Sequence, residues 1–467
     1  MNITASGGGL SISDVRGCPS GQRPRPISSL GRNLLLSYNI PVTDERSTGL
    51  VRRLGFFSAV LSGLGVTIGA GIYVLIGAAA GSAGNAVWLS FILAAVAAAF
   101  TALSYARLVA LRPKDAPEFQ YVSMAFGRGA GFLAGWLMLW AAFVSAAVIS
   151  LGFAGYLENL FNVPIAAGAL GLVAVTALVT LAGIRHSVAV LGILTVPTVL
   201  GLVAIIIIGA PYIGDVDLLE APRGFAGIWG GAALVFYAFL GFNGMANLAE
   251  EMNHPEKDLP RAMVVVLATS TVLYVLVAIA AVSVVGWADL ARSSAPVAEV
   301  MIRTLGTDAG VAISLVSLAA TGSTGLFLLL SASRAVWAMS CAGVLPLPFC
   351  SVGQRRTPGI AILGVAAIAS LFIAIMNVET VARFSNIAVL LAFAAVNAAA
   401  MKLFGQTLRG RLLPGLGLIF SLWLALNTEL PAMLYGAALT VTGVVFYRVM
   451  VFRGKRPGTQ TAAGDGE

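Results

Sequence analysis

The sequence predicts an all-α integral membrane protein with twelve transmembrane helices. Of its 467 residues, 58% are hydrophobic and only 10% are charged, whereas soluble domains carry about 25% charged residues. Long uncharged apolar runs recur along the chain, each near the roughly 20 residues that a helix needs to cross a bilayer. The composition therefore excludes a soluble protein, and we attribute the net charge of +8 to membrane topology, with no nucleic-acid partner.

Apolar runs bounded by charged or turn residues define the expected transmembrane spans. They are residues 55–79, 85–111, 130–156, 163–182, 187–210, 224–249, 262–286, 308–340, 358–376, 381–401, 412–426 and 431–450. The span 308–340 is too long for one vertical crossing, so we expect a helix that is tilted or extends into the cytoplasm.

The distribution of basic residues predicts how these spans are oriented. With the N terminus in the cytoplasm, 24 of the 28 Lys and Arg residues fall in inner segments. The exceptions are Arg223, Arg292, Arg303 and Arg383. This bias follows the positive-inside rule. We therefore expect a multi-pass protein of the cell membrane with both termini in the cytoplasm.

The two ends of the chain, residues 1–50 and 453–467, are polar, and we expect both to be disordered cytoplasmic tails. Cys18 falls in the first tail, while Cys341 and Cys350 lie at an inner helix end or loop. Because the cytoplasm keeps thiols reduced, we expect no disulfide.

Charged residues fall only in loops or at helix ends, which leaves the twelve helix interiors without charge. An intramembrane ionisable group would mark a proton relay or ion path. An intramembrane hydrolase would need acid–base groups or metal ligands at depth, and an oxidoreductase would need axial histidine pairs. We therefore expect no enzyme, no cofactor and no metal site, and we expect backbone groups and neutral side chains to carry the function.

The first span contains the stretch GLGVTIGAGIYVLIG, residues 63–77, in which glycines interrupt an apolar helix. Each glycine in a helix interior costs about 1 kcal/mol relative to alanine, and unwound backbone survives in lipid only where it lines a protein cavity. If the chain unwinds at residues 68–71, the N–H groups of the second half-helix attract a carboxylate. The carbonyls of Thr67 and Ile68 then attract an ammonium group. The alternative is a packing face of small residues.

The sixth span reads LVFYAFLGFNGMANLAEE, residues 234–251, and Gly241 and Gly244 break its aromatic run. Interrupted helices at positions one and six are typical of two inverted five-helix repeats of the leucine-transporter type, with a substrate site at their interface. The aromatic residues that we expect around this site are Phe236, Tyr237 and Phe239, with helix packing as the alternative for one or two of them.

The repeat pattern also divides the chain. Residues 51–210 form the expected first repeat with helices 1–5, and residues 211–402 form the second with helices 6–10. Residues 403–452 supply two additional C-terminal helices.

Four stretches resemble the amino acid–polyamine–organocation superfamily, in the order that this family has them. The first-span stretch is similar to its GxG(I)(F/Y)V signature. FYAFLGFNGMANLAEEMNHPEKDLPRAM, residues 236–263, is close to its sixth-helix motif, especially in the cationic amino acid transporter subgroup. SRAVWAMSCAGVLP, residues 333–346, and FSNIAVLLAFAAVNAAAMKL, residues 384–403, resemble the end of its eighth helix and its tenth helix.

The resemblance implies a secondary amino acid transporter that works by alternating access in the lipid bilayer. The positions that match the family's carboxylate site are Gly69, Ala70 and Gly71. The positions that match its amino-group site are Thr67, Ile68, Tyr237, Ala238 and Leu240. Because no acidic partner for a cationic side chain is expected at depth, we expect a neutral, zwitterionic amino acid as substrate. The alternatives are exchange of polyamines or cationic amino acids, and a non-transporting amino acid sensor.

This chain departs from the family pattern at three places. Thr198 stands where proton-coupled relatives often carry a lysine in the fifth helix, and threonine cannot exchange a proton as a lysine does. Asn243, which we expect at the substrate site, replaces an acidic residue of the sixth helix, and Arg107 replaces a glutamate at the end of the second. The next loop reads APEFQYV, residues 116–122, where relatives have a Gly-Gly-aromatic turn, so we expect altered closure on the inner side.

Without that lysine, the coupling ion, Na⁺ or H⁺, stays open. Uncharged oxygen ligands suit a hard cation such as Na⁺, and first-helix carbonyls would share it with hydroxyl groups. The candidate hydroxyl residues are Thr198, Thr321, Ser323 and Thr324. Ser and Thr also pack helices in membranes, and ion-free facilitated diffusion or exchange is the alternative.

The inner loop EEMNHPEKDLPRAM, residues 250–263, is rich in charge. One interpretation is a solvated connector whose prolines end one helix and start the next. The other is an inner gate in which Glu250 or Glu251 pairs with Arg107 or Arg334.

Overall fold

The computed structural model describes residues 54–454, except residues 294, 354–356, 376–377, 427 and 429. All of the described residues belong to one structural unit. The predicted tails therefore lie almost entirely outside the described residues, as does Cys18.

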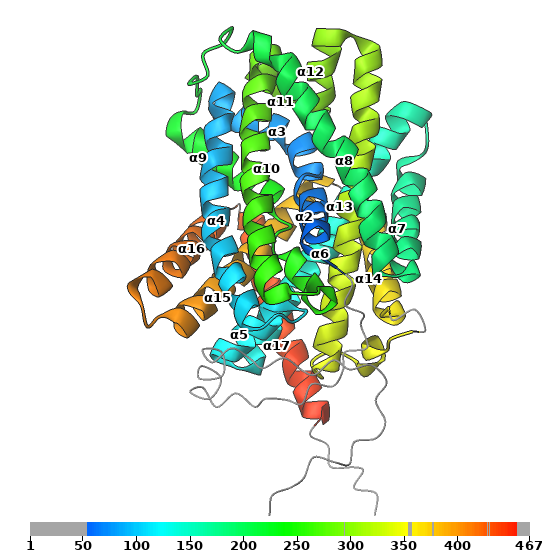
Figure 1. Ribbon diagram of the computed structural model, residues 1–467, viewed down its shortest axis with the longest axis vertical. Coiled ribbons are helices and arrows are strands. Elements are labelled where there is room, and N and C mark those ends of the chain that lie inside the picture. The colour runs from blue at the N-terminus through cyan, green and yellow to red at the C-terminus, as the bar shows by residue number, and fades with distance from the viewer. Residues whose placement is uncertain are drawn as a thin grey trace, which may run out of the picture. The chain divides into compact units, whose positions relative to one another are not determined.

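Helices make up nearly all of the described chain (Figure 1). In chain order they are α2 (Phe56–Thr67), α3 (Ala70–Ala83), η1 (Gly84–Ala86), α4 (Val87–Leu111), α5 (Pro117–Phe126), α6 (Arg128–Phe161), α7 (Ile165–Ala182), α8 (Ile184–Gly209), η2 (Ala210–Tyr212), α9 (Gly224–Val235), η3 (Phe236–Phe239), η4 (Gly244–Glu251), α10 (Pro255–Val285), α11 (Trp287–Arg292), α12 (Pro296–Leu305), α13 (Thr307–Cys341), η5 (Leu347–Cys350), α14 (Gly359–Ile375), α15 (Val378–Phe404), α16 (Leu408–Leu426) and α17 (Leu430–Gly454). Within the described ranges, strand-like pairing is limited to an isolated bridge between Leu54 and Met252.

The helices have the length and surface of membrane-spanning segments. Ten helical segments of the described chain are long and apolar enough to cross a bilayer, and two shorter apolar helices, Gly359–Ala374 and Gly410–Leu426, accompany them. Each expected span overlaps one of these segments. Large apolar side chains such as Leu178 on α7, Ile193 on α8 and Leu434 on α17 are exposed, as contact with lipid tails requires. The all-α integral membrane class is therefore confirmed.

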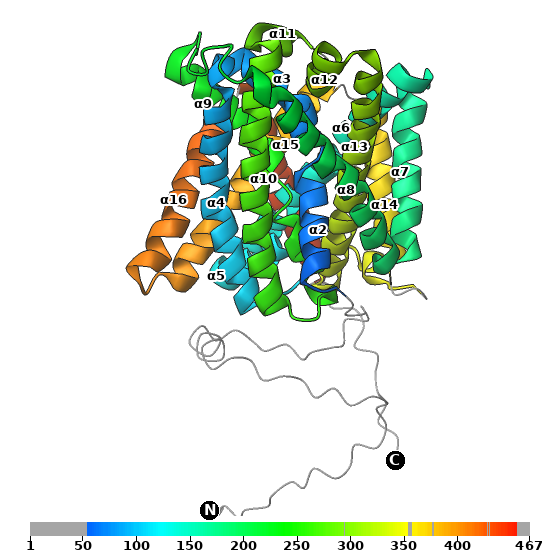
Figure 2. The ribbon, with the colours of Figure 1, turned by 45° about the horizontal axis from the view of Figure 1, so that its top comes forward.

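A set of long helices surrounds the segments that glycines interrupt. Figure 2 shows α10 between α4 and α2, and α10 packs against both. On the other side, α13 packs against α6, α8 and α2. The α13 helix runs without interruption for 35 residues, as its long apolar sequence predicts. These helices bury the centre of the structure, where α2, α3, η3 and η4 meet.

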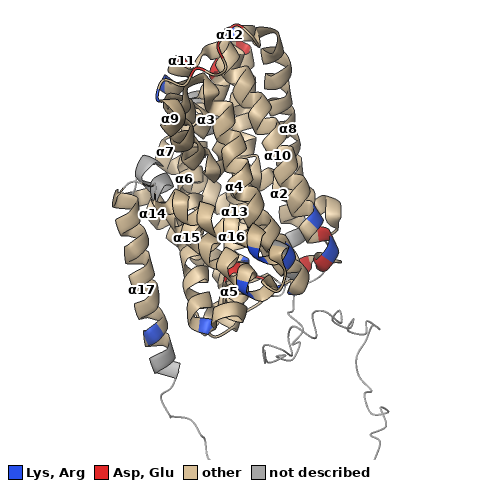
Figure 3. Cartoon of the chain, turned by 90° about the vertical axis from the view of Figure 1, so that its left-hand side faces the viewer, with Lys and Arg blue, Asp and Glu red and all other residues tan. Residues whose placement is uncertain are grey.

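Charged residues gather near the ends of the helices, and the long middle sections of the ribbon in Figure 3 contain almost none. We call one end the basic end, because Arg112, Lys114, Arg128 and Lys402 lie there at or near helix termini. There Lys402 Nζ donates to the carbonyl of Ala125 at 2.7 Å. The short helix α5 lies at this end, and α11 and α12 lie at the opposite end (Figure 2).

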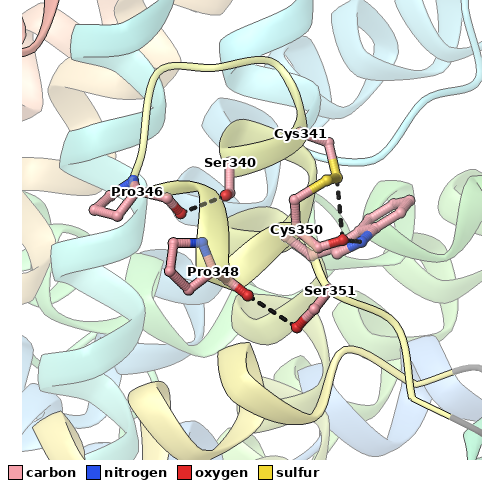
Figure 4. Close-up of a disulfide and its surroundings, with 7 residues drawn as sticks. Ser340, Cys341, Pro346, Pro348, Cys350 and Ser351 are labelled. Atoms are coloured by element: carbon pink, nitrogen blue, oxygen red, sulfur yellow. Dashed lines mark hydrogen bonds between the residues drawn. A yellow bond between two sulfur atoms is a disulfide. The ribbon is translucent and has the colours of Figure 1, made fainter.

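Cys341 and Cys350 form a disulfide (Figure 4), so the expectation of reduced thiols is wrong for this pair. The chain turns back after α13 and η5 returns to the helix end, which brings the two Cα atoms to 4.9 Å, within the usual range for a disulfide. Ser340 Oγ also donates to the Pro346 carbonyl at 2.6 Å. The sequence argument used the redox compartment alone and had no information on this proximity.

Candidate functional site

The first interruption, residues 68–69, separates α2 from α3 within one apolar run. Ile68 and Gly69 both leave the helical conformation and both are buried. A Cβ atom on Gly69 would lie 1.7 Å from Thr324 Oγ1 on α13, so only glycine allows α13 to approach this closely. Because the first N–H groups of a helix lack intrahelical acceptors, the start of α3 presents donors at this point.

The second interruption, residues 240–243, lies between the short 3₁₀ helices η3 and η4. Leu240 is extended, and Gly241 has a φ of +139°, a conformation that favours glycine. A Cβ atom on Gly241 would lie 2.8 Å from the Val66 side chain and 2.9 Å from Thr67 Oγ1. The second interruption therefore packs directly against the end of α2.

The two interruptions meet at Tyr274 of α10. Its hydroxyl group bonds to the Thr67 carbonyl, and it lies 3.1 Å from the carbonyl of Ala238. On the other side, a Cβ atom on Gly71 would lie 2.5 Å from Ala238 Cα. One hydroxyl proton serves one carbonyl at a time, so Tyr274 shares its donor between two peptide groups that the sequence assigns to an amino-group site.

A cavity opens beside the two interruptions. Of the predicted substrate residues, six line it: Thr67, Gly71, Tyr237, Ala238, Leu240 and Asn243. Apolar side chains from α6 and α13 form much of the remaining wall, including Met138, Leu139, Ile149, Leu328 and Met339. The cavity thus combines non-helical backbone with an apolar surface.

Four predicted residues lie elsewhere. Ile68 and Gly69 are buried at the first interruption but do not line the cavity. Phe236 packs against Phe393, and Phe239 packs against Phe91 and Tyr274. Of the three aromatic residues expected around the pocket, only Tyr237 reaches it, and helix packing accounts for the other two. The backbone of Ala70 begins α3, but its side chain lies outside the described part of the structure.

A carboxyl group also lines the cavity, which the sequence reasoning did not expect. Glu118 follows Pro117 in the first turn of α5, and only 3% of its surface is exposed. Its Oε1 atom accepts a hydrogen bond from the Tyr105 hydroxyl at 2.7 Å and lies 3.5 Å from Asn243 Nδ2. Burial raises the pKa of this carboxyl above its ordinary value. Glu118 lies outside the expected spans, as predicted, but it belongs to the helix α5 and not to a loop, and α5 brings its side chain into the cavity.

The predicted ion-site residues make mainly local contacts. Thr198 Oγ1 donates to Leu194, Thr321 Oγ1 to Ser317, and Thr324 Oγ1 to Ala320. Each of these acceptors is a carbonyl of the residue's own helix. Ser323 is different, because its Oγ atom lies 3.0 Å from the Gly65 carbonyl on α2. Of the four hydroxyl groups, only that of Ser323 is shown to contact a first-span carbonyl.

Two of the four predicted gate residues, Glu251 and Arg334, form an ion pair with each other. Arg334 Nη2 lies 2.9 Å from Glu251 Oε1, and both side chains are buried. Arg334 lies inside α13, so the expectation that helix interiors carry no charge is wrong here. Arg107 lies half-buried near the end of α4. The side chain of Glu250 is outside the described part of the structure.

Asn247 of η4 connects three elements next to this ion pair. Its Oδ1 atom accepts the Ala116 N–H at 3.0 Å, and its Nδ2 atom donates to Ser331 Oγ at 2.9 Å. Ala116 has a left-handed conformation with φ of 55° at the start of α5. Asn247 therefore ties the α5 N terminus and α13 to the segment that follows the second interruption.

Comparison with known proteins gives the family. The sequence profile of the amino acid permease family matches residues 54–454. The chain belongs to this amino acid permease family. The resemblance drawn from the interrupted spans is thus confirmed at the level of the family, and this permease is an integral membrane transporter by family.

Three relatives show the range of the permease's similarity. A protein of Mycobacterium tuberculosis described as an uncharacterised transporter is 35% identical over 426 residues, which cover 89% of this chain and 95% of the relative. The branched-chain amino acid permease BcaP of Bacillus subtilis is 28% identical over 440 residues, covering 85% and 92%. The cationic amino acid transporter 4 of Mus musculus is 30% identical over 377 residues, covering 75% and 59%.

Tyr274, Asn247 and Glu118 are the functional candidates that sequence reasoning missed. Glu118 had a signal, because it lies in the APEFQYV loop that departs from the Gly-Gly-aromatic turn of the family. Tyr274 is one of several hydroxyl-bearing residues in an apolar span, and nothing in the sequence places its hydroxyl group at an interruption.

Proposed function

We propose that this permease carries a zwitterionic amino acid across the cytoplasmic membrane by alternating access, and that backbone groups of the two interruptions hold the substrate. The observation that carries the proposal is one cavity lined by Thr67 and Gly71, which flank the first interruption, and by Leu240, Gly241 and Asn243 of the second. Non-helical backbone at membrane depth is tolerated where it lines a cavity inside the protein. The start of α3 supplies N–H donors and the positive end of a helix dipole for the substrate carboxylate.

The substrate's amino group is assigned to the carbonyls around Thr67 and Ala238. Tyr274 already contacts both carbonyls, but a carbonyl oxygen has two lone pairs and can accept a second donor. Tyr274 thereby orients the two acceptors relative to each other. In this arrangement, neutral groups hold both charged ends of a zwitterion.

The side chain of the substrate is assigned to the apolar wall of the cavity. Methionine, leucine and isoleucine side chains of α6 and α13 form this wall, and contact with them favours an apolar substrate side chain. The similarity to a branched-chain amino acid permease supports the same class. We therefore name L-leucine as the probe substrate.

The two interruptions also support a repeat organisation. Residues 51–210 and 211–402 would each form a five-helix repeat, with the helix pair α2–α3 opening the first and the α9–η4 segment opening the second. Residues 403–452 would add two helices outside the repeats. Interrupted helices in corresponding first positions of the two halves favour this division.

The ion pair of Glu251 and Arg334 is assigned to a gate at the basic end, which the positive-inside rule predicts as cytoplasmic. The pair joins the segment after the second interruption to α13, and Asn247 adds a second connection between the same elements. Separation of η4 from α13 would open the cavity toward this end.

The proposal is tested with the purified protein reconstituted into liposomes. Saturable, stereoselective counterflow of L-leucine is expected, with little counterflow of L-arginine. Leucine binding in detergent without any counterflow in liposomes would identify a sensor instead. Preferred counterflow of arginine or of polyamines would favour the cationic alternative, for which the Glu118 carboxyl in the cavity is the specific observation.

A further inference from the structure

The Glu118 carboxyl has no role in the proposed binding of a zwitterion, whose two charged ends are assigned to backbone groups. It lines the same cavity as the two interruptions while almost all of its surface is buried. It comes from α5 and not from a spanning helix. A titratable group at such a position is a candidate for a role in transport.

The partners of this carboxyl are neutral. The Tyr105 hydroxyl and the Asn243 amide face its Oε1 atom, and within the described ranges of the chain Glu118 takes part in no ion pair. An ionised carboxylate that is buried without a cation is costly, and such a group usually neutralises instead. Glu118 in its buried position therefore requires a positive charge beside it, and a proton is the smallest one.

Other titratable groups lie near α5, but the basic groups for which a partner is described here bond to groups other than the Glu118 carboxyl. The acidic, basic and phenolic groups near it include Tyr105 and Arg107 (α4), Arg112, Lys114 and Asp115 (the loop before α5), Tyr121 (α5), Arg128 (α6) and Lys402 (α15), and Tyr237 of η3 lines the same cavity. Lys402 donates to the carbonyl of Ala125 at the far end of α5, and Arg128 donates to the carbonyl of Ala342. The Arg334 guanidinium is paired with Glu251.

The Glu118 carboxyl is also connected by hydrogen bonds to the second interruption, which would move during transport. Asn243 Oδ1 accepts the N–H of Gly241 at 3.3 Å, while the amide nitrogen of Asn243 faces Glu118. A change in the charge of Glu118 would thus alter the hydrogen bonding of the second interruption. The start of α5, two residues before Glu118, is held by Asn247 of η4.

We propose that Glu118 is the proton-binding site of this permease and couples amino acid transport to the movement of one proton in the same direction. The inference rests on the transport function proposed above. In this proposal, Glu118 provides the titratable group that is missing at position 198, where this chain has threonine in place of a lysine.

The cycle conserves charge and protons. When the cavity opens to the outside, water enters and Glu118 takes up one proton as the zwitterion binds. The neutral carboxyl is then buried in the closed cavity without an unpaired charge. When the cavity opens to the cytoplasm, the proton leaves to water. The empty cavity then keeps water around the carboxylate while the protein returns to the outward-open state, so the ionised group is never buried without solvent. Each cycle moves one proton and one zwitterion, with net transfer of one positive charge.

The experiment uses full-length protein in liposomes with radiolabelled L-leucine and a pH indicator trapped in the lumen. With the membrane potential held at zero, an inward proton gradient of one pH unit should concentrate leucine up to ~10-fold, since one unit corresponds to a tenfold ratio for one coupled proton. Leucine entry should acidify the lumen. A Na⁺ gradient alone should produce no accumulation.

Variants then locate the proton. Glu118→Gln should lose both the accumulation and the acidification, while Glu118→Asp, which keeps a carboxyl group, should retain both with a shifted pH profile. Glu158→Gln, at an exposed position near the end of α6, is the matched control and should behave as the wild type. Measurable leucine counterflow shows that a variant is folded. If Glu118→Gln does not fold, the Glu118→Asp profile and the luminal pH of the wild type test the inference.

The results separate this inference from the function proposed above. No leucine counterflow in the wild type would overturn the transport function itself. Counterflow without accumulation under a proton gradient would overturn only the proton site, as would accumulation driven by Na⁺. Accumulation that persists in Glu118→Gln would also overturn it. If Glu118→Gln loses arginine binding and keeps leucine accumulation, the carboxyl binds a substrate cation and not the coupling proton.

Discussion

The Arg334 guanidinium lies 2.9 Å from the Glu251 carboxylate, and neither side chain has appreciable contact with solvent. The pair joins α13 to the segment that follows the second interruption. An ion pair at this depth gains little net stability over an apolar pair, because both charges lose their hydration. A connection between two elements that would separate in the proposed transport cycle is therefore a more fitting role than stabilisation.

Removal of one member of this pair should be costly. Glu251→Gln leaves the Arg334 charge buried without its partner, and such changes destabilise proteins by about 3–5 kcal/mol. The melting temperature in detergent should fall clearly. Glu256→Gln, at the exposed start of α10, should leave it nearly unchanged.

The gate role predicts more than a loss of stability. Exchange of the two charges in the double variant Glu251→Arg with Arg334→Glu should restore part of the leucine counterflow lost in either single variant. Equal loss in the double variant and the single variants would speak against a gate formed by this pair.

Tyr274→Phe should loosen the junction between the two interruptions. The change removes the hydroxyl group that contacts the carbonyls of Thr67 and Ala238. Buried acceptors left without a donor cost roughly 1–3 kcal/mol, so both the melting temperature and leucine affinity should decrease. Tyr212→Phe, at the partly exposed η2, is the control. Unchanged leucine affinity in Tyr274→Phe would contradict the proposed orientation of the amino-group acceptors.

The sequence predicts the membrane class and several residues of one cavity for a physical reason. Apolar length and glycine position are local properties, and they identified Thr67, Gly71 and Tyr237 as neighbours of one cavity. The position of Glu118 in the cavity depends instead on how α5 packs against α6 and α15. A carboxylate outside the spans can be exposed to water or buried in a cavity, and the sequence alone could not distinguish these two positions.

The aromatic residues of the sixth span show the same limit. Phe236, Tyr237 and Phe239 are close in sequence, and a regular helix would suggest similar surroundings for the first and third. In the 3₁₀ helix η3, side chains three residues apart point the same way, so Phe236 and Phe239 share one face and Tyr237 lies on another. Only the structure shows that Tyr237 lines the cavity while Phe239 packs against Phe91.

Gly71→Ala should impair transport although it adds a single methyl group. The new Cβ atom would lie 2.5 Å from Ala238 Cα, so α3 and η3 would have to move apart. Overpacking of this kind costs about 1–3 kcal/mol, and leucine counterflow should decrease several-fold while the protein still inserts into the membrane. Gly152→Ala on α6, where nothing lies within 4 Å of the added atom, should transport normally. Full activity of Gly71→Ala would show that the close approach is unnecessary.

The Glu118 carboxyl should make stability depend on pH in a defined direction. Burial raises its pKa in the folded protein, so the folded state binds this proton more tightly than the unfolded chain does. The stabilisation is complete below the unfolded pKa and is lost as the pH rises through the folded pKa. The melting temperature of the wild type should therefore fall over this interval, relative to that of Glu118→Gln measured in the same buffers.

Tyr105→Phe provides a second check on the same group. The Tyr105 hydroxyl donates to Glu118 and lowers the pKa of the carboxyl, opposing the effect of burial. Its removal should raise this pKa further, which moves the loss of stability and the pH profile of leucine accumulation to higher pH. The substitution removes only the hydroxyl group that bonds to Glu118. A shift to lower pH, or the same profile in Tyr105→Phe and the wild type, would therefore mean that the titrating group is not Glu118.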